Sequence, residues 1–190
     1  MARWDPDGRE RLVRAALDLF AEQGYDNTTV AQIAERAGLT KSTFFRHFPD
    51  KREVLAAGQD TLCRLLSDGI AGAPESATPL EAVAEALDAV AAAFTPERRD
   101  LGQKMQEAIA ASSELQERDT LKRVGLATAM TNALKQRGVP DTTASLASEM
   151  GVLALKTAHS RWADATNDQE LTALLRQSLH ELQTASATLS

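Results

Sequence analysis

The pattern that most limits how this chain can fold lies in residues 28–51, TTVAQIAERAGLTKSTFFRHFPDK. Thr29 is followed three residues later by Gln32, and this capping box predicts that a helix begins directly after Thr29. Gly38 supplies the left-handed backbone that ends this helix, and Thr40 can cap a second helix at once. Two short helices joined by such a turn predict a helix-turn-helix motif.

The second helix of this motif has one face for packing and another for external contacts. Phe44 and Phe48 are four residues apart, so they fall on the same face and are expected to be buried. Polar and basic side chains project from the rest of the helix, and no acidic residue lies between Arg36 and Phe48. This free face is suited to contacts with DNA.

The charge of the chain is unevenly distributed. The 190 residues carry a formal net charge of −6, but residues 1–55 hold equal numbers of basic and acidic side chains. The later part therefore carries the whole negative charge and is expected to face away from phosphate. A chain of this length can form one or two domains with an adequate core.

Several classes of site are not predicted. A single cysteine and no apolar leader or membrane-spanning run indicate a reduced, cytoplasmic protein with no membrane contact. Cys63 lies among leucines, which favours a buried, inert thiol over a redox sensor. His159 and His180 have no ligand-like spacing to Cys63, so we predict no metal and no cofactor. No catalytic constellation can be assembled, so an enzyme is disfavoured.

Helical periodicity fills the chain, and every proline lies where a helix would begin or end. We predict an all-α fold of nine helices. Three form an N-terminal helix-turn-helix bundle in residues 1–50, and six form a ligand-binding and dimerisation domain in residues 51–190. Besides the two helices of the motif, helices are expected at 8–23, 51–70, 79–94, 96–111, 113–138 and 141–165, and after Asn167.

Taken together, these motifs resemble the DNA-binding region of TetR-type (tetracycline-repressor-like) transcriptional regulators. The resemblance extends upstream through RERLVRAALDLFAEQGYDNTTV and downstream through FPDKREVL, with all features in the same order. It implies the same fold and binding to a double-stranded operator with two-fold related half-sites. One departure is Phe45, where the family commonly has tyrosine, so a phenolic hydroxyl often used on a DNA phosphate is missing.

Within the resemblance, individual residues take expected roles. Lys51, the Thr29 cap region and His47 would contact phosphate, while Lys41, Ser42, Thr43 and Arg46 would read bases. Phe45 would touch a thymine methyl or sugar, or else be half-buried in the bundle. The full set predicted to bind DNA is Thr28, Thr29, Lys41, Ser42, Thr43, Phe45, Arg46, His47 and Lys51.

The resemblance also implies a small-molecule effector. The segment LKTAHSRWADATNDQELTALLRQSL leans towards the subgroup whose C-terminal domain binds acyl-CoA-like ligands. The candidate lining residues, for which ordinary core packing is the alternative, are Phe94, Met105, Ile109, Met130, Met150, Leu153 and Trp162. Basic candidates for the phosphates of a full thioester are Arg98, Arg99, Lys104, Lys122 and Arg123.

A homodimer is expected, held by two antiparallel helices from each subunit. The predicted interface residues are Leu146, Met150, Leu153, Ala154, Ala158, Leu171, Leu174, Leu175, Leu179 and Leu182. The expected function is a ligand-responsive repressor that its effector releases from DNA, with the fourth helix as the lever. The alternatives are a helical small-molecule-binding or interaction module that does not regulate transcription, and an enzyme.

Overall fold

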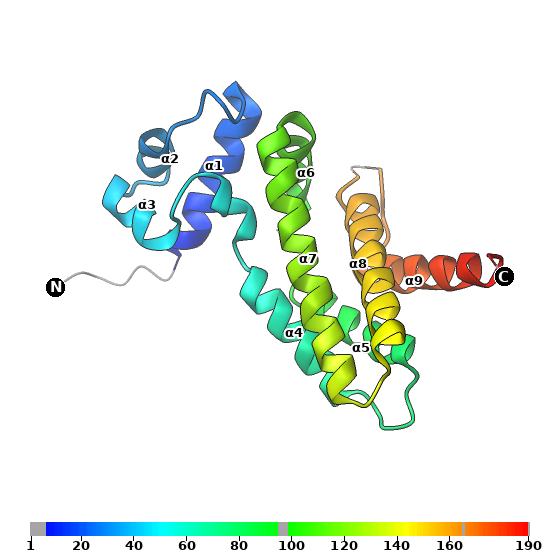
Figure 1. The fold of residues 1–190 in the computed structure, drawn as a ribbon. Helices are drawn as coiled ribbons and strands as arrows, with labels where there is room; N and C mark the ends of the chain where they lie inside the picture. Colours follow the sequence, from blue (N-terminus) through cyan, green and yellow to red (C-terminus); the bar gives the residue numbers. More distant parts are fainter. Residues whose placement is uncertain (1–6, 95–98, 165, 190) are drawn as a thin grey trace. The chain divides into compact units, whose positions relative to one another are not determined.

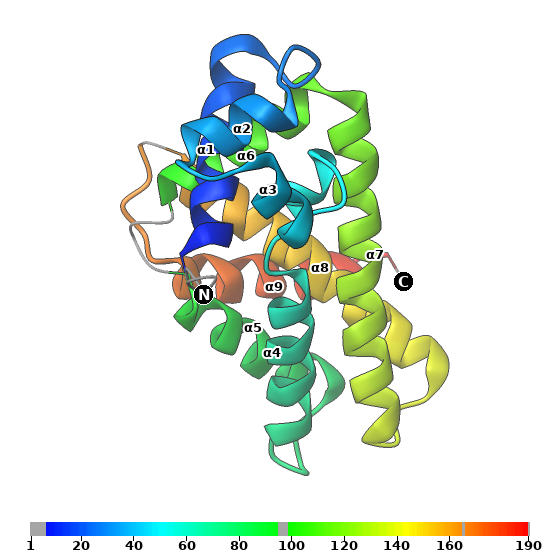
Figure 2. The ribbon, with the colours of Figure 1, turned by 90° about the vertical axis from the view of Figure 1, so that its left-hand side faces the viewer.

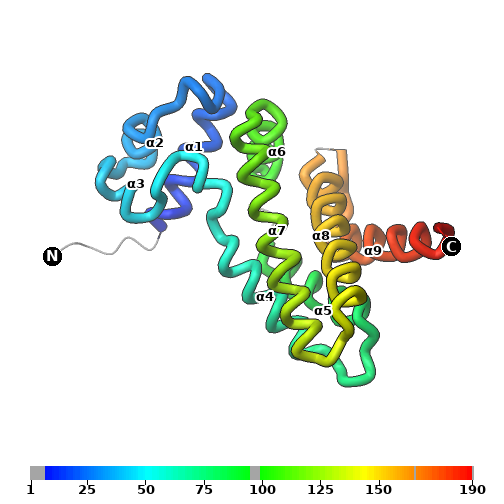
Figure 3. Tube along the Cα trace, in the orientation of Figure 1, coloured from blue at the N-terminus to red at the C-terminus, as the bar shows by residue number. Residues whose placement is uncertain are grey.

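The structure is a computed structural model that describes residues 7–94, 99–164 and 166–189 (Figures 1 and 3). This part of the chain is all-helical, as predicted, with nine α-helices, one 3₁₀ helix (η1) and no strand. In chain order the elements are α1 Gly8–Gln23, α2 Val30–Arg36, α3 Lys41–His47, η1 Arg52–Ala56, α4 Gln59–Gly72, α5 Pro79–Ala92, α6 Arg99–Ala111, α7 Ser113–Gln136, α8 Asp141–Ala163 and α9 Leu171–Ala187.

The chain forms two compact units. The N-terminal unit contains the residues up to Ala57 together with Leu101–Leu121, and the C-terminal unit contains Gly58–Asp100 and the residues from Lys122 onward. Both α6 and α7 therefore begin in one unit and end in the other. The sequence predicts a DNA-binding domain in residues 1–50 and a ligand-binding and dimerisation domain in residues 51–190. The two compact units do not test these roles, so this division stays a prediction.

The N-terminal unit is built around α1, α2, α3 and η1 (Figure 2). Leu12 and Leu17 of α1 and Phe44 of α3 are fully buried in one apolar core. The beginning of α7 completes this core with Leu115, which is also fully buried. A segment more than fifty positions beyond η1 is therefore part of the same unit.

The predicted fourth helix over residues 51–70 is wrong, because two shorter helices replace it (Figure 1). Asp50 does cap the first of them, accepting hydrogen bonds from the amides of Arg52 and Glu53. The helix then stops, because Ala57 leaves the helical region (φ −54°, ψ 123°) and Gly58 is left-handed (φ 81°). Glycine adopts this backbone at no steric cost, and α4 begins after it.

The C-terminal unit contains α4, α5, α8, α9 and the later part of α7. A capping box of Thr78 and Glu81 opens α5, close to the start predicted at residue 79. α4 packs so closely on α5 that a Cβ added at Gly69 would lie 2.5 Å from the Cα of Ala86. α9 packs against both α5 and α8. Among the described residues, no helix combines the length and apolar character needed to cross a membrane.

Ser113 and Asn167 are the residues from which the sequence predicts caps for α7 and α9, and neither acts as one. Ser112 instead accepts a hydrogen bond from the amide of Leu115 at the start of α7. Asn167 accepts a hydrogen bond from the Gln169 amide within the preceding loop, so it does not cap α9. The predicted start of the sixth helix, at residues 95 and 96, lies outside the described residues.

Candidate nucleic-acid interface

The two helices of the motif begin and end as the sequence predicts. Thr29 and Gln32 form the reciprocal capping box, with the Gln32 amide donating to Thr29 Oγ1 (3.3 Å) and the Thr29 amide donating to Gln32 Oε1 (2.8 Å). Gly38 has a φ of 66° in the turn. Thr40 Oγ1 then accepts from the Thr43 amide at 3.1 Å and caps α3. Local hydrogen bonds thus set the direction in which α3 leaves the turn.

α3 has the two faces that its periodicity predicts. Phe44 and Phe48 are buried, with ring centroids 5.6 Å apart. Lys41, Ser42 and Arg46 are exposed. Phe45 is half-buried, with its ring packed on Phe44 (5.7 Å between centroids) and 49% of the residue exposed, while its contact with DNA stays a prediction. The free face of α3 therefore combines a hydroxyl, two cations and an aromatic ring.

The cations on and beside this face lie close to aromatic rings. The Nζ of Lys41 lies 5.8 Å from the centre of the Phe45 ring. The guanidinium carbon of Arg9 lies 5.3 Å from the centre of the Phe48 ring. Burial, followed by the positive charges of Arg46 and Arg9, lowers the pKa of His47. Arg9 was absent from the predicted set, although a basic residue at the exposed start of the first helix was a visible signal. This cluster of positive charge would attract phosphate.

Two predicted DNA contacts turn inward. Thr28 is buried, and its hydroxyl donates to the Gly24 carbonyl at 2.8 Å. The ammonium of Lys51 donates to the carbonyls of Tyr25 (2.6 Å) and Thr28 (3.0 Å), with a longer contact to that of Asp26 (3.5 Å). An ammonium has three protons, so these carbonyls use its donors. We therefore reassign Thr28 and Lys51 as residues that hold the turn between α1 and α2.

The residues proposed to line a ligand cavity do not form one cluster. Met105 and Ile109 of α6 pack against the core of the N-terminal unit. Met130 is fully buried in the C-terminal core, where its Sδ and Cε occupy the space beside Gly151. Leu153 is exposed on α8. Phe94 and Trp162 are in direct ring contact, with centroids 6.2 Å apart, and the His159 ring lies 5.7 Å from Phe94 and 5.9 Å from Trp162.

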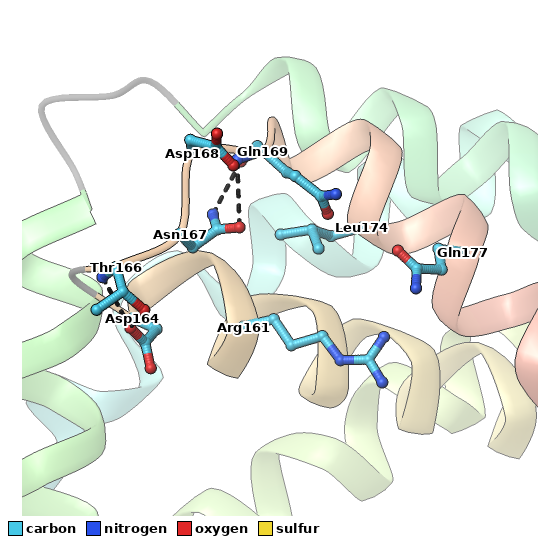
Figure 4. Close-up of a pocket in the computed structure, with 8 residues that line it drawn as sticks. All are labelled: Arg161, Asp164, Thr166, Asn167, Asp168, Gln169, Leu174 and Gln177. Carbon is cyan, nitrogen blue, oxygen red and sulfur yellow. Dashed lines mark hydrogen bonds between the residues drawn. The ribbon is translucent and has the colours of Figure 1, made fainter.

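Two surface hollows lie in the C-terminal unit. The larger, about 410 Å³, is mainly polar and lies where α8 ends and α9 begins (Figure 4). Its lining residues are Arg161, Asp164, Thr166, Asn167, Asp168, Gln169, Leu174 and Gln177. The smaller, about 260 Å³, is lined by Thr78, Pro79, Leu80, Thr143, Leu146, Ala147, Met150 and Gln183. Of the candidate lining residues, only Met150 borders either hollow.

Some of the basic residues proposed to hold a nucleotide already have partners. Arg99 donates to the carbonyls of Asp164 and Asn167, and Lys104 pairs with Asp18 at 2.5 Å. Arg98 lies outside the described residues.

Cys63 is half-buried, and burial together with the charge of Asp60 raises the pKa of its thiol. A thiol with a raised pKa is less reactive, which favours an inert cysteine over a redox sensor.

The predicted dimer residues fall into a buried and an exposed set. Leu171, Leu174, Leu175 and Leu179 of α9 are buried against their own chain, as are Ala154 and Ala158 of α8. They therefore cannot form the surface that meets a second copy without leaving this core. Leu146 and Leu153 are 60% and 46% exposed. Met150 and Leu182 are half-buried.

A capped helix-turn-helix whose second helix keeps an exposed basic face defines a class, the helix-turn-helix DNA-binding proteins. Residues 12–57 match the family model described as "Bacterial regulatory proteins, tetR family". The chain is also 40% identical over 82 residues to the HTH-type transcriptional regulator TcmR of Streptomyces glaucescens, a match covering 43% of this chain and 36% of TcmR. The N-terminal domain of this chain is therefore similar to that of the TetR family.

Solved structures are similar over nearly the whole chain. NalD, the secondary repressor of the MexAB-OprM multidrug efflux pump in Pseudomonas aeruginosa, is 20% identical over 94% of this chain and 96% of its own (TM-score 0.61). The fatty acid degradation regulator FadR of Bacillus halodurans is 20% identical over 94% and 95% (TM-score 0.57). At such identities the likeness establishes the fold alone.

Proposed function

We propose that the protein is a homodimeric transcriptional repressor that binds a two-fold related operator and leaves it when a small effector binds. The observation that carries this proposal is the exposed face of α3, where Lys41, Ser42 and Arg46 are free above a core of buried phenylalanines. Amino and guanidinium groups and a hydroxyl in the major groove can donate hydrogen bonds to base edges. Arg9 and His47 would meet the flanking phosphates.

The dimer proposal explains how such a protein can be switched. Two recognition helices must enter major grooves about 34 Å apart, so a small change of angle spoils the fit to both half-sites. A coupling free energy of about 1–3 kcal/mol would change operator affinity by about 5–150-fold. The surface we propose for the dimer is the exposed side of α8, where Leu146, Met150 and Leu153 follow each other at helical spacing.

For the effector we propose an apolar or amphipathic small molecule, with a long acyl compound as the favoured case. Support comes from the aromatic cluster of Phe94, His159 and Trp162 and from the resemblance near the end of the chain. Burial of an acyl chain would contribute about 25 cal/mol per Å² of apolar surface. A series of acyl chain lengths, with and without the nucleotide head group, should show binding by calorimetry. A flat response across the series would require another effector.

The decisive experiment is capture and sequencing of genomic DNA fragments on the purified full-length protein. Arg46→Ala and Lys41→Ala should each reduce selectivity for the captured sequence by about 1–3 kcal/mol per lost base contact. Arg161→Ala changes an arginine of the C-terminal unit that pairs with Glu181, and it serves as the matched control. Equal selectivity in Arg46→Ala and in the parent would show that α3 is not the reading helix.

The same experiment separates the competing classes. A helical module that does not regulate transcription would enrich no sequence, whereas a regulator would. The relatives are transcriptional regulators, and we propose that this chain also acts by binding rather than catalysis. Among the described residues, no group of three or more His, Cys, Asp or Glu side chains could hold a metal ion.

A further inference from the structure

The chain passes between its two units at three places, and their backbones differ. The first passage, at Ala57 and Gly58, is a break between η1 and α4. The second falls in the first turn of α6, between Asp100 and Leu101. The third falls inside α7, between Leu121 and Lys122, and the helix runs through it without interruption. A continuous helix transmits displacement along its axis better than a two-residue break, because every turn is hydrogen-bonded to the next.

The first turns of α7 are fastened to the N-terminal unit by side chains. The Tyr25 hydroxyl donates to the Glu114 carboxylate at 2.8 Å. The guanidinium of Arg118 donates twice to the carboxylate of Glu53, at 2.8 and 2.9 Å. Leu115, between these two residues, is fully buried. Both hydrogen-bonded contacts bridge positions more than sixty residues apart, so they hold tertiary structure and not one helix.

The pair of Arg118 and Glu53 is well placed to transmit force. Its side chains are 13% and 23% exposed, whereas those of the Arg161–Glu181 pair are 40% and 44% exposed. A shielded ion pair is less screened by salt, and breaking it leaves a partly buried charge without its partner. The bidentate arrangement also fixes the direction of the guanidinium. A movement of α7 would therefore move Glu53 and with it η1, the next helix after α3 in the chain.

The contact of Glu114 continues to the recognition motif. The Lys51 ammonium lies 4.0 Å from the centre of the Tyr25 ring, in a cation–π contact. The same ammonium donates hydrogen bonds to the carbonyls of Tyr25 and Thr28. Thr28 immediately precedes the Thr29 cap of α2. A chain of contacts thus runs from α7 through the turn before α2 to the segment after α3.

The other end of α7 is anchored in the C-terminal core. Leu126, Met130 and Leu134 are buried there at successive turns. Any ligand or conformational change that repacks this core must move or strain the same helix that carries Glu114 and Arg118. The helix has no break at which such a movement could be absorbed.

We propose that α7 is the element that couples the C-terminal unit to DNA reading, with Glu114 and Arg118 as its positioning residues. This inference rests on the proposed function, because it needs a reading helix to control. The fourth helix, predicted from sequence as the lever, is joined to η1 through a break, whereas α7 is continuous between the units. Neither residue needs to touch DNA for its contact to matter.

Operator DNA itself is the probe, because coupling between two sites is reciprocal. Hydrogen exchange would be measured on the full-length protein with and without a fragment obtained by genomic capture. In the parent, DNA binding should slow exchange of the α7 amides beyond residue 121 by about fivefold or more, the lower end of typical coupling. Arg118→Met and Tyr25→Phe should each reduce this effect, and Arg161→Met, the matched control, should preserve it.

A charge swap separates positioning from simple destabilisation. Arg118→Glu and Glu53→Arg should each weaken the response of α7, and the double variant should restore it if the pair acts through its contact. Tyr25→Phe removes one hydroxyl and keeps the test available if an arginine variant fails to fold. If the parent binds operator but α7 exchange is unchanged, or all variants respond like the parent, the inference is overturned and the proposed function stands. If the parent binds no fragment selectively, the proposed function fails and the inference falls with it.

Discussion

At the scale of single residues, the sequence predicted which side chains of α3 are exposed, but not which way the side chains of the nearby loops point. Lys41, Ser42 and Arg46 are exposed as expected, because their helix has a buried face that leaves them no other direction. Lys51 and Thr28 turn inward, because the loop before α2 presents carbonyl groups that need donors. Sequence shows that a lysine is present, but not that three carbonyls will converge on it.

We therefore expect Lys51→Ala to act on stability more than on phosphate binding. The turn before α2 would lose its shared donor, and at about 1 kcal/mol or more per lost charge-assisted hydrogen bond the unfolding midpoint should fall. The dependence of operator affinity on salt should keep the slope of the parent, because no phosphate contact is removed. A slope reduced by about one, with unchanged stability, would restore the phosphate role.

His47 provides a test by pH. The pKa of His47 is lowered in the free protein from the ordinary histidine value of about 6.5. The folded state therefore binds fewer protons at this residue than the unfolded chain does. A DNA phosphate would favour the charged form and raise the pKa in the complex. Operator affinity should accordingly increase as pH falls through the range in which His47 gains its proton. The increase should be smaller in His47→Gln. Parallel pH profiles would place His47 away from phosphate.

At the scale of helices, start signals were predicted more reliably than interruptions. α1 spans residues 8–23 as expected, and the capping threonines open α2, α3 and α5 because a cap acts within four residues. The break at Gly58 was missed, since the apolar spacing on both sides continues as if the helix were unbroken. The leucine stripe of α9 was found, but periodicity does not say which partner covers it, and here α5 and α8 of the same chain do.

Two glycines of α4 provide a matched pair of variants. A Cβ at Gly69 would lie 2.5 Å from the backbone Cα of Ala86, so Gly69→Ala should separate α4 from α5 and destabilise the protein by about 1–3 kcal/mol. A Cβ at Gly72 meets nothing within 4 Å, and Gly72→Ala should be neutral or stabilise by up to about 1 kcal/mol. Denaturant unfolding of both variants measures the difference. Equal stability would mean that the two helices can part without cost.

At the scale of the whole molecule, the helical architecture could be predicted from the sequence. Which segments belong to which compact unit could not. Nine helices could be counted from apolar spacing and punctuation within the part of the chain that the structure describes. The assignment of residues 101–121 to the N-terminal unit could not, because Leu115 and Arg118 reach partners distant in sequence. The same limit separated the proposed ligand residues, which sequence treated as one cavity.

Assembly is the prediction that belongs to this scale. Leu146→Glu and Leu153→Glu would each place a charge without a partner in the proposed α8 interface, so they should yield monomers and weaken operator binding. Leu121→Glu is the control, because Leu121 is 57% exposed on α7, outside that surface. Sedimentation at micromolar concentration measures the outcome. A parent that is itself monomeric, or dimers that survive both α8 variants, would exclude this surface.

The inclusion of residues 101–121 in the N-terminal unit has a consequence for building hybrid regulators. A hybrid that borrows only residues up to Ala57 would lose Leu115 from its core and leave Glu53 and Tyr25 without Arg118 and Glu114. Transplanting the reading head onto a foreign sensor domain therefore requires two stretches of sequence, joined through a recipient that can supply both connections. Recombination that exchanges one contiguous block would separate what the fold keeps together.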